Sequence, residues 1–215
     1  MNWASLHTLP VHTVTPDGYE HEQLRRDDIE AVVRNIRNWY PDISVGAGHG
    51  FVDVSFYQRR VCLAGEPETD VIVYVCKKAG EIVSMTAIER DSTSATLQGR
   101  LAVVCPEHRN SGLARFGPFI LDHQASAMGM ALAYSRVSLK HIYAQRLVER
   151  AGFTLVGIMP ASDREVVHPG VVRHVPEALY AKVYAPRNMQ FFPADDYMTD
   201  EVRRMWHYLF ESVRR

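Results

Sequence analysis

The positions of this chain with the clearest chemical signature are 104–114, which read VCPEHRNSGLA. They follow an apolar run typical of a buried strand and precede a stretch with helical spacing. A junction of this kind exposes unpaired backbone N–H groups at the positive end of a helix dipole. Gly112 lets the main chain approach a bulky anion, Ala114 is too small to block it, and Arg109 adds a fixed positive charge. These features predict a cradle for a pyrophosphate group.

The same positions resemble motif A of the GNAT family of N-acetyltransferases, which reads V-x-P-x-aromatic-R-x-x-G-[IL]-[GA]. The residues that match it are Val104, Pro106, Arg109, Gly112, Leu113 and Ala114, with His108 in the aromatic place. A second block, residues 144–153, resembles the family's motif B, a helix that runs into a Gly-Phe pair, here Gly152 and Phe153. The resemblance covers roughly residues 27–184.

The resemblance implies a fold and a co-substrate. The fold is α+β (mixed α/β), the GNAT fold: a central, mostly antiparallel sheet that is splayed at the cofactor site and flanked by helices. The co-substrate is acetyl-CoA or another acyl-CoA, and a backbone N–H at the splay would stabilise the oxyanion. The cofactor-binding residues carried over from the motifs are Val103, Val104, Arg109, Asn110, Ser111, Gly112, Leu113, Ala114, Arg115, His141 and Ala144.

The catalytic positions depart from the family's pattern. Val148 stands where a tyrosine often serves as general acid, and Gln98 stands where a glutamate often serves as base. The candidate catalytic residues are therefore Glu89, the nearest carboxylate, His141, which titrates near neutrality, and Tyr143 on the motif B helix. The alternatives are a solvated strand end for Glu89, structural or surface roles for the other two, and a base that acts through water.

The function implied by the resemblance is an acyl-CoA-dependent N-acyltransferase, most simply an N-acetyltransferase. Its acceptor would be a primary amine on a small molecule or a protein, which attacks the thioester directly. The alternative is a GNAT-fold module that binds CoA as a sensor or interaction partner, which the absent acid and base favour. A third idea, a synthase that uses an acyl carrier protein, is disfavoured because such an enzyme need not hold the pyrophosphate of CoA.

Charge and cysteine content exclude several other classes. The chain has 215 residues and a formal net charge of −1, so nucleic acid and acidic membranes are not expected partners. Its three cysteines form no CxxC pair, which argues against a disulfide framework and against a bound metal. We expect a cytoplasmic protein, since no signal peptide is visible and the apolar runs are too short to cross a bilayer.

Hydrophobic spacing predicts the elements that must position the motifs. The expected strands are 11–15, 70–76, 81–89, 95–104, 131–137, 154–159 and 175–184. The expected helices are one from 27 that ends at Pro41, then 51–63, 112–130 with a bend at Pro118, and 139–151, with a loop over 44–50. The three strands from 70 to 104 read as an antiparallel meander.

The C-terminal part reads as a separate extension. We expect residues 1–185 to form the acyltransferase domain and residues 186–215 an aromatic tail with an extra helix. Thr199 is a suitable N-cap, and apolar residues from Val202 to Val213 recur at helical spacing. This stripe would pack on the domain or on a partner subunit, and a homodimer is one assembly that would cover it.

Overall fold

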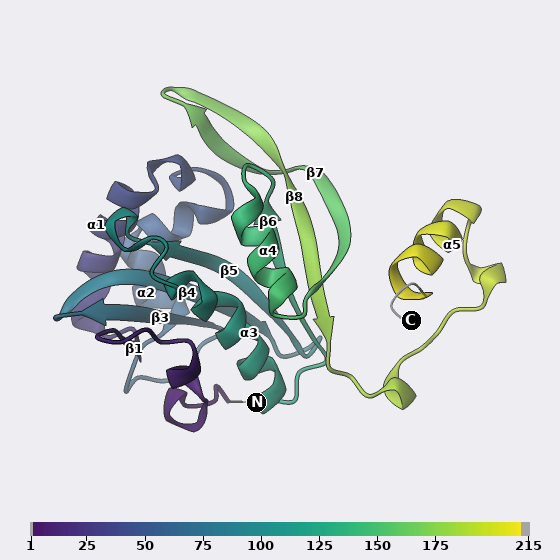
Figure 1. The fold of residues 1–215 in the computed structure, drawn as a ribbon, viewed down its shortest axis with the longest axis horizontal. Coiled ribbons are helices and arrows are strands. Elements are labelled where there is room, and N and C mark those ends of the chain that lie inside the picture. Colours follow the sequence, from purple (N-terminus) through teal and green to yellow (C-terminus); the bar gives the residue numbers. More distant parts are fainter. Residues whose placement is uncertain (1, 212–215) are drawn as a thin grey trace. The chain divides into compact units, whose positions relative to one another are not determined.

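The structure, a computed structural model, describes residues 2–211 (Figure 1). The chain divides into two compact units, the first ending at Tyr184 and the second beginning at Ala185. In the first unit, helices cover both faces of one open sheet. The strands of its main path follow the order β1-β3-β4-β5-β6-β8-β7, and β2 pairs with β3 beside that path.

The helices are α1 (Ile29–Trp39), α2 (Val54–Arg60), α3 (Phe116–Ala127), α4 (Ile142–Arg150) and α5 (Asp200–Trp206). The strands are β1 (Glu20–Gln23), β2 (Val61–Cys62), β3 (Val71–Lys78), β4 (Glu81–Asp91), β5 (Thr96–Val104), β6 (Leu132–Ser138), β7 (Thr154–His168) and β8 (Val171–Val183).

The antiparallel meander expected from the sequence is present as β3, β4 and β5. Its β-branched and apolar residues are buried on both faces, because a helical layer covers each side. One core lies between the sheet and α1 and α2, and another lies between the opposite face and α3 and α4. Figure 1 shows the two helical layers on opposite sides of the meander.

Pairing between β5 and β6 stops halfway along both strands. The two strands are parallel, and residues 96–99 pair with residues 132–135. Beyond that point β5 continues beside β4 and β6 continues beside β8. Arg100 is a bulge in β5 against β4, and a bulge bends its strand. The sheet is therefore splayed between β5 and β6, as the resemblance implied.

The N-terminal region differs from the sequence-based expectation. Residues 11–15 were expected to form a strand, but Val11–Thr13 is a 3-10 turn. Its apolar side chains pack against the α3 core instead of pairing with a sheet edge. Strand β1 was not predicted, because its sequence Glu-His-Glu-Gln lacks the alternation that marks a half-buried strand.

Several predicted elements have different bounds. The helix expected over 51–63 is shorter, because α2 ends at Arg60 and the chain then enters β2. Most of the loop expected over 44–50 lies in the 3-10 helix Gly46–Val52. The helix expected from 112 begins only at Phe116, after the 3-10 turn Leu113–Arg115. Pro118 therefore lies in the first turn of α3, where a missing N–H costs little.

The hairpin formed by β7 and β8 extends well beyond the strands expected from the sequence. Its far half reaches the turns that connect α1 to α2. There the backbone N–H of Ala47 donates to Asp163 Oδ1 of β7 at 2.8 Å. Lys140, in the turn between β6 and α4, pairs with both Glu165 of β7 and Asp42, and its Nζ lies 3.0 Å from Asp42 Oδ2. The hairpin is thus attached to the α1–α2 connection directly and through Lys140.

The second unit contains α5, whose N-cap Thr199 accepts a hydrogen bond from the backbone N–H of Val202. A π-helical turn, His207–Glu211, follows it. Val213 in the expected helix lies outside the described residues. None of the helices within residues 2–211 is long and apolar enough to cross a membrane.

Candidate functional site

The loop between β5 and α3 carries a set of free backbone donors. The N–H groups of Asn110, Ser111 and Gly112 make no hydrogen bond with any of the described residues. Asn110 and Gly112 have φ values of +66° and +94°, a conformation that glycine adopts freely. This alternation turns successive amides to one side of the loop, which creates an anion-binding nest. The pyrophosphate cradle predicted from the sequence is consistent with this geometry.

Side chains fix the shape of the loop. Ser111 Oγ donates to the carbonyl of His108 at 2.6 Å, and Tyr19 Oη lies 2.9 Å from Nδ1 of the same histidine. Arg109 is exposed, and its guanidinium lies 5.1 Å from the ring centroid of Tyr40. Its positive charge is therefore available beside the free amides.

The splay exposes backbone groups of β5. Ala102 and Val104 lie opposite β4 residues in non-hydrogen-bonded positions, because the N–H of Cys105 pairs with Val83. Their N–H and C=O groups therefore point away from β4 and into the gap beside β6. Tyr40 Oη contacts the carbonyl and N–H of Val104 at 3.3 and 3.4 Å. The Ala102 N–H has no strand partner, since the β5–β6 ladder ends at residue 99.

The motif B residues lie across the splay, on α4. His141 is the exposed N-cap of that helix, and Ala144 is partly buried against the α3–α4 core. Within residues 2–211 no hydrogen bond or ion pair joins either residue to the 109–115 loop. Val148, in the place of the family's tyrosine, is buried in the same core at 8% exposure.

The three candidate catalytic residues do not converge. His141 and Tyr143 have ring centroids 6.0 Å apart, and Tyr143 is 76% exposed. Glu89 lies on β4, on the face covered by α1 and α2. Both of its carboxylate oxygens are engaged, one by Arg60 at 3.1 Å and the other by Arg100. A carboxylate held by two guanidinium groups is poorly placed to take a proton.

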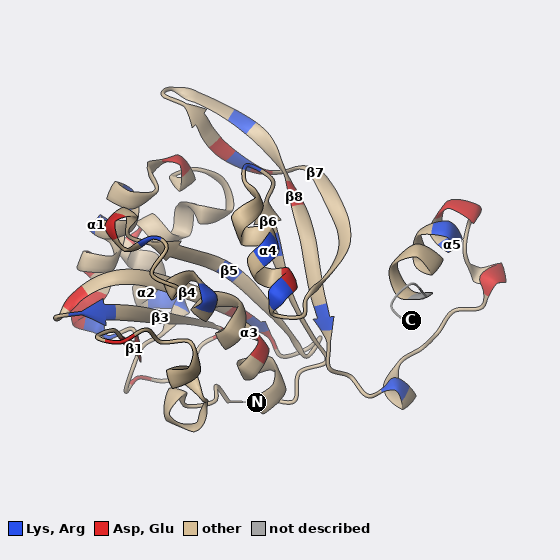
Figure 2. Cartoon of the chain, in the orientation of Figure 1, with Lys and Arg blue, Asp and Glu red and all other residues tan. Residues whose placement is uncertain are grey.

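The α1–α2 face of the sheet is strongly polar next to the splay. A cavity of about 260 Å³ opens over the paired part of β5 and β6, and it is lined by Glu89, Arg90, Asp91, Thr96, Gln98 and Tyr134. Tyr134 Oη donates to Gln98 Oε1 at 3.3 Å. Figure 2 shows basic and acidic residues interspersed along the hairpin and α4.

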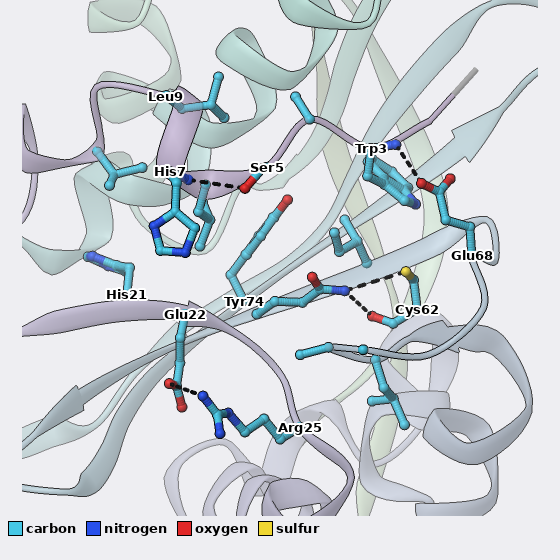
Figure 3. A pocket seen from close by; sticks show the side chains of 18 of the residues that line it. Trp3, Ser5, His7, Leu9, His21, Glu22, Arg25, Cys62, Glu68 and Tyr74 are labelled. Carbon is cyan, nitrogen blue, oxygen red and sulfur yellow. Dashed lines mark hydrogen bonds and ion pairs between the residues drawn. The ribbon is translucent and has the colours of Figure 1, made fainter.

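A larger cavity, of about 620 Å³, lies elsewhere in the first unit (Figure 3). The N-terminal segment, residues 2–19, forms one wall, and β1, β2 and β3 supply much of the rest. Trp3, Leu9 and Tyr74 contribute apolar surface, whereas His21 and Glu22 contribute polar groups. This cavity adjoins the outer edge of the sheet at β1, away from the β5–β6 splay.

The N-terminal segment also lies beside the loop that forms the candidate cradle. A Cβ placed on Gly112 would have Pro16 as its nearest neighbour, at 3.8 Å. His21 stacks on Phe116, the first residue of α3, with ring centroids 3.7 Å apart. Burial lowers the pKa of His21 from 6.5 to about 4, so this ring stays neutral near pH 7. The stacked pair supports the start of the helix behind the cradle.

The cysteine within motif A is not arranged as a nucleophile. Cys105 Sγ donates to Glu107 Oε2 at 2.6 Å, and partial burial together with that carboxylate raises the pKa of the thiol. A protonated thiol is a weak nucleophile. Across residues 2–211, no three metal-binding side chains cluster in a way that would hold an ion.

Two residues at the splay are not predicted by the sequence. Tyr40 follows the helix that ends before Pro41, and no local signal indicates that it reaches β5. The bulge at Arg100 does have a local signal, because an isolated glycine within a strand, here Gly99, is typical of a bulge.

No protein-family model and no curated protein matches the sequence. A variant of the spermidine N-acetyltransferase SpeG from Vibrio cholerae matches the structure with a TM-score of 0.60 and 14% identity, covering 91% of this chain and 98% of that chain. A second variant of the same enzyme gives 0.59 and 17% identity, with 77% of this chain and 94% of that chain covered.

The IAA acetyltransferase from Bacillus cereus matches with a TM-score of 0.53 and 13% identity, over 77% of this chain and 99% of that chain. At these identities the likeness is one of fold. Strand order, the interrupted β5–β6 pairing and the solved structures agree with one another, and they confirm the fold class expected from the motifs. The chain has the fold of the GNAT acetyltransferases.

Proposed function

We propose that this protein is an acyl-CoA-dependent N-acyltransferase, and most simply an N-acetyltransferase that acts on a primary amine. The observation that carries the proposal is that an anion-binding loop follows an open strand edge in the chain. The free amides of the 110–112 loop lie directly after the strand whose unpaired edge faces the splay. An anion-binding loop and an open strand edge together suit a ligand with a pyrophosphate and an amide-rich arm, which is the chemistry of CoA.

Three groups of residues would contact different parts of the ligand. The amides of Asn110, Ser111 and Gly112, with the charge of Arg109, would hold the pyrophosphate. The edge of β5 at Ala102 would pair with the arm of the ligand. The N-terminal end of α4, with His141 and Ala144, would form the opposite wall.

The chemistry would rest mainly on placement. An acyl-CoA supplies an activated thioester. The Ala102 N–H points into the splay without a partner, so it is the donor best placed to stabilise charge that develops on a carbonyl oxygen there. The acceptor amine would approach from the face of the sheet covered by α1 and α2, called here the acceptor face.

Proton transfer would depend little on the predicted side chains. Glu89 is held by two arginines, and the position of the usual acid is taken by the buried Val148. A thiol with a pKa near 8.5 is a tolerable leaving group without an acid. A missing acid or base slows such a step by about 10²–10⁴-fold and does not forbid it. We therefore propose a base that acts through water.

The second candidate is a CoA-binding sensor without turnover. The burial of Val148 and the hydrogen bond that engages Gln98 favour it, because neither family position offers a proton-transfer group. Such a protein would bind acetyl-CoA as tightly as an enzyme does. It would release no CoA in the presence of any amine.

We also propose that the acyltransferase domain ends near Ala185. The tail that follows would serve assembly. Its apolar side chains are strongly exposed, including Phe191 at 78% and Met205 at 55%. Exposed apolar patches of this kind mark interaction surfaces. One solved protein with the same fold, a spermidine N-acetyltransferase, is described as dodecameric.

The test of the proposed function is thiol release. Purified protein is mixed with acetyl-CoA and a panel of amines, and free CoA is followed with a thiol reagent. Release that depends on both an amine and the protein, with an acetylated amine seen by mass spectrometry, supports an acetyltransferase. Tight binding of acetyl-CoA without release across the panel supports the sensor instead.

A further inference from the structure

Two arginines face the splay from opposite sides. Arg100 is the bulge residue of β5, directly after the last pair of the β5–β6 ladder, and Arg136 is the next residue of β6 after that pair. Arg136 alternates with the buried Ala133 and Val137 of the α3–α4 core, so its side chain is on the acceptor face. Arg100 reaches the same face, because it pairs with Glu89 there.

The counter-ions of the two arginines lie on their outer sides. Arg100 pairs with Glu89 of β4, and Arg136 lies 3.8 Å from Glu177 Oε2 of β8. Within residues 2–211 no carboxylate lies within 4.0 Å of both guanidinium groups. Glu89 is shared with Arg60 as well, so it does not serve Arg100 alone.

Each arginine has a carboxylate partner, but the two guanidinium groups also act on each other. Both side chains are mostly buried, at 22% exposure for Arg100 and 27% for Arg136. Burial and the nearby positive charges of Arg136 and Arg60 lower the pKa of Arg100, whereas Tyr134 and the carboxylate of Asp163 oppose that shift. A guanidinium group presents paired N–H donors that match a carboxylate or a phosphate.

A cavity lies near this pair, toward the paired part of the two strands. The 260 Å³ cavity opens on the same face over the paired part of β5 and β6, and its lining includes Glu89, the partner of Arg100. On the other side, Ser162 Oγ of β7 donates to Glu177 Oε2 at 2.8 Å. This bond holds the Glu177 carboxylate toward β7, so the carboxylate contacts Arg136 from one side only. Lys140 pairs with Asp42 and Glu165, and the carboxylate of Asp163 also acts on Arg100.

We propose that the acceptor amine also carries an anionic group, a carboxylate or a phosphate ester, which Arg100 and Arg136 bind together. The proposal rests on the proposed function and specifies its substrate class. The anion bridges the two guanidinium groups, and the amine of the same molecule is thereby directed to the splay at Ala102. A polycationic amine such as spermidine meets two positive charges at this point and is a poor acceptor.

The first test compares matched acceptors by acetyl-CoA-dependent thiol release. Each amino acid of a panel is paired with the amine formed by its decarboxylation, and phosphoethanolamine is paired with ethanolamine. We expect kcat/KM to be at least about 10-fold higher for the anionic member of the preferred pair, the size of one charge-assisted hydrogen bond. Preference within the amino acid pairs indicates a carboxylate, and preference for phosphoethanolamine indicates a phosphate ester.

Equal rates within every pair, or faster acetylation of the neutral-tailed amines or of spermidine, would overturn the proposal while leaving the acetyltransferase function intact. Absence of thiol release with all amines would instead count against the proposed function and remove the basis of the substrate assignment. The two failures are therefore distinguishable in one experiment.

The second test uses variants. Arg136→Gln should lower kcat/KM for the anionic acceptor by about 10- to 100-fold and change the decarboxylated acceptor by less than about 3-fold. Arg136→Lys, which keeps the charge but loses the fork, should fall between wild type and Arg136→Gln. Arg60→Gln is the matched control, since it removes a guanidinium from Glu89 outside the splay and should leave the ratio between acceptors unchanged.

A melting curve with acetyl-CoA establishes that each variant is folded and binds the co-substrate. If Arg136→Gln lowers both acceptors alike, or if Arg60→Gln changes the ratio as much, the role assigned to the pair is wrong. Arg100→Gln is an independent test, because it removes the arginine on the other side of the splay. It should change the same ratio of kcat/KM between the anionic and the decarboxylated acceptor.

Discussion

Replacing Gln124 with leucine should loosen the N-terminal segment from the rest of the first unit. Gln124 lies on α3 and is fully buried. Its side-chain amide accepts from the N–H of Ala4 at 2.9 Å and donates to the carbonyl of Ala4 at 2.7 Å. It also donates to Tyr74 Oη at 2.7 Å. One glutamine thus joins α3, β3 and the segment that walls the larger cavity.

The size of the effect follows from these bonds. Leucine leaves the Tyr74 hydroxyl buried without a partner, which costs about 1–3 kcal/mol. Each of the two lost bonds to Ala4 contributes about 0.5–1.5 kcal/mol. The free energy of unfolding should fall by about 2–6 kcal/mol, a large part of the 5–15 kcal/mol typical of a domain. Urea denaturation measures this, and limited proteolysis should cut the released segment first.

A double-mutant cycle separates the polar network from simple repacking. Tyr74→Phe removes the orphaned hydroxyl, so the double variant should be more stable than the sum of the two single changes by about 1–2 kcal/mol. Gln145→Leu on α4 is the control, because Gln145 makes one surface hydrogen bond, and its effect should stay within about 0.5 kcal/mol. A loss below 1 kcal/mol for Gln124→Leu, or strict additivity with Tyr74→Phe, would refute the reasoning.

Two further predictions concern pH and the tail. Because the folded-state pKa of His21 is lowered to about 4, the unfolded chain binds the extra proton between about pH 4 and 6.5, and stability falls as pH drops through that window. His21→Phe, which keeps the stack on Phe116, should remove up to about 3 kcal/mol of that dependence; urea titrations at pH 4.5 and 7.5 with equal pH slopes for both proteins would contradict this. Deleting the residues after Ala185 should change the oligomeric state or the acceptor kinetics and spare acetyl-CoA affinity. Light scattering and kinetics unchanged by the deletion would show that the tail has neither role.

The sequence was most informative where local chemistry decides the structure. The meander was predictable because its apolar runs are separated by turn residues such as Gly80, which has a φ of +84°. The position of the loop that we propose as the cradle was predictable because Gly112 and Arg109 lie at a strand-to-helix junction. Both depend on residues that are neighbours in the chain, so their spacing alone carries the signal.

Features that depend on distant contacts were beyond the sequence. Strand β1 is polar and is held by its pairing with β3. No local sequence pattern predicts this pairing. Arg100 and Arg136 lie on either side of the same gap only because a parallel crossover through α3 brings β6 beside β5. Tyr40 reaches Val104 from 64 positions away along the chain. Tertiary contacts of this kind override local propensity.

The measurement that tests the central claim most directly is the thermal shift produced by acetyl-CoA in wild type, Gly112→Glu and Gly129→Glu. Both glycines have positive φ values, +94° and +66°, so both substitutions impose similar backbone strain. A side chain at Gly112 meets only Pro16, at 3.8 Å, so the protein should fold with a carboxylate placed in the cradle. Gly129 lies beyond the C-terminal end of α3 and is the control.

At a hundredfold excess over Kd, binding adds about 2.7 kcal/mol, which raises the Tm of a chain of this size by roughly 5–11 °C. We predict that rise for wild type and Gly129→Glu and its loss in Gly112→Glu. No shift in wild type at millimolar acetyl-CoA, or an equal shift in all three proteins, would contradict the assignment of the 109–114 loop as the cradle for acyl-CoA.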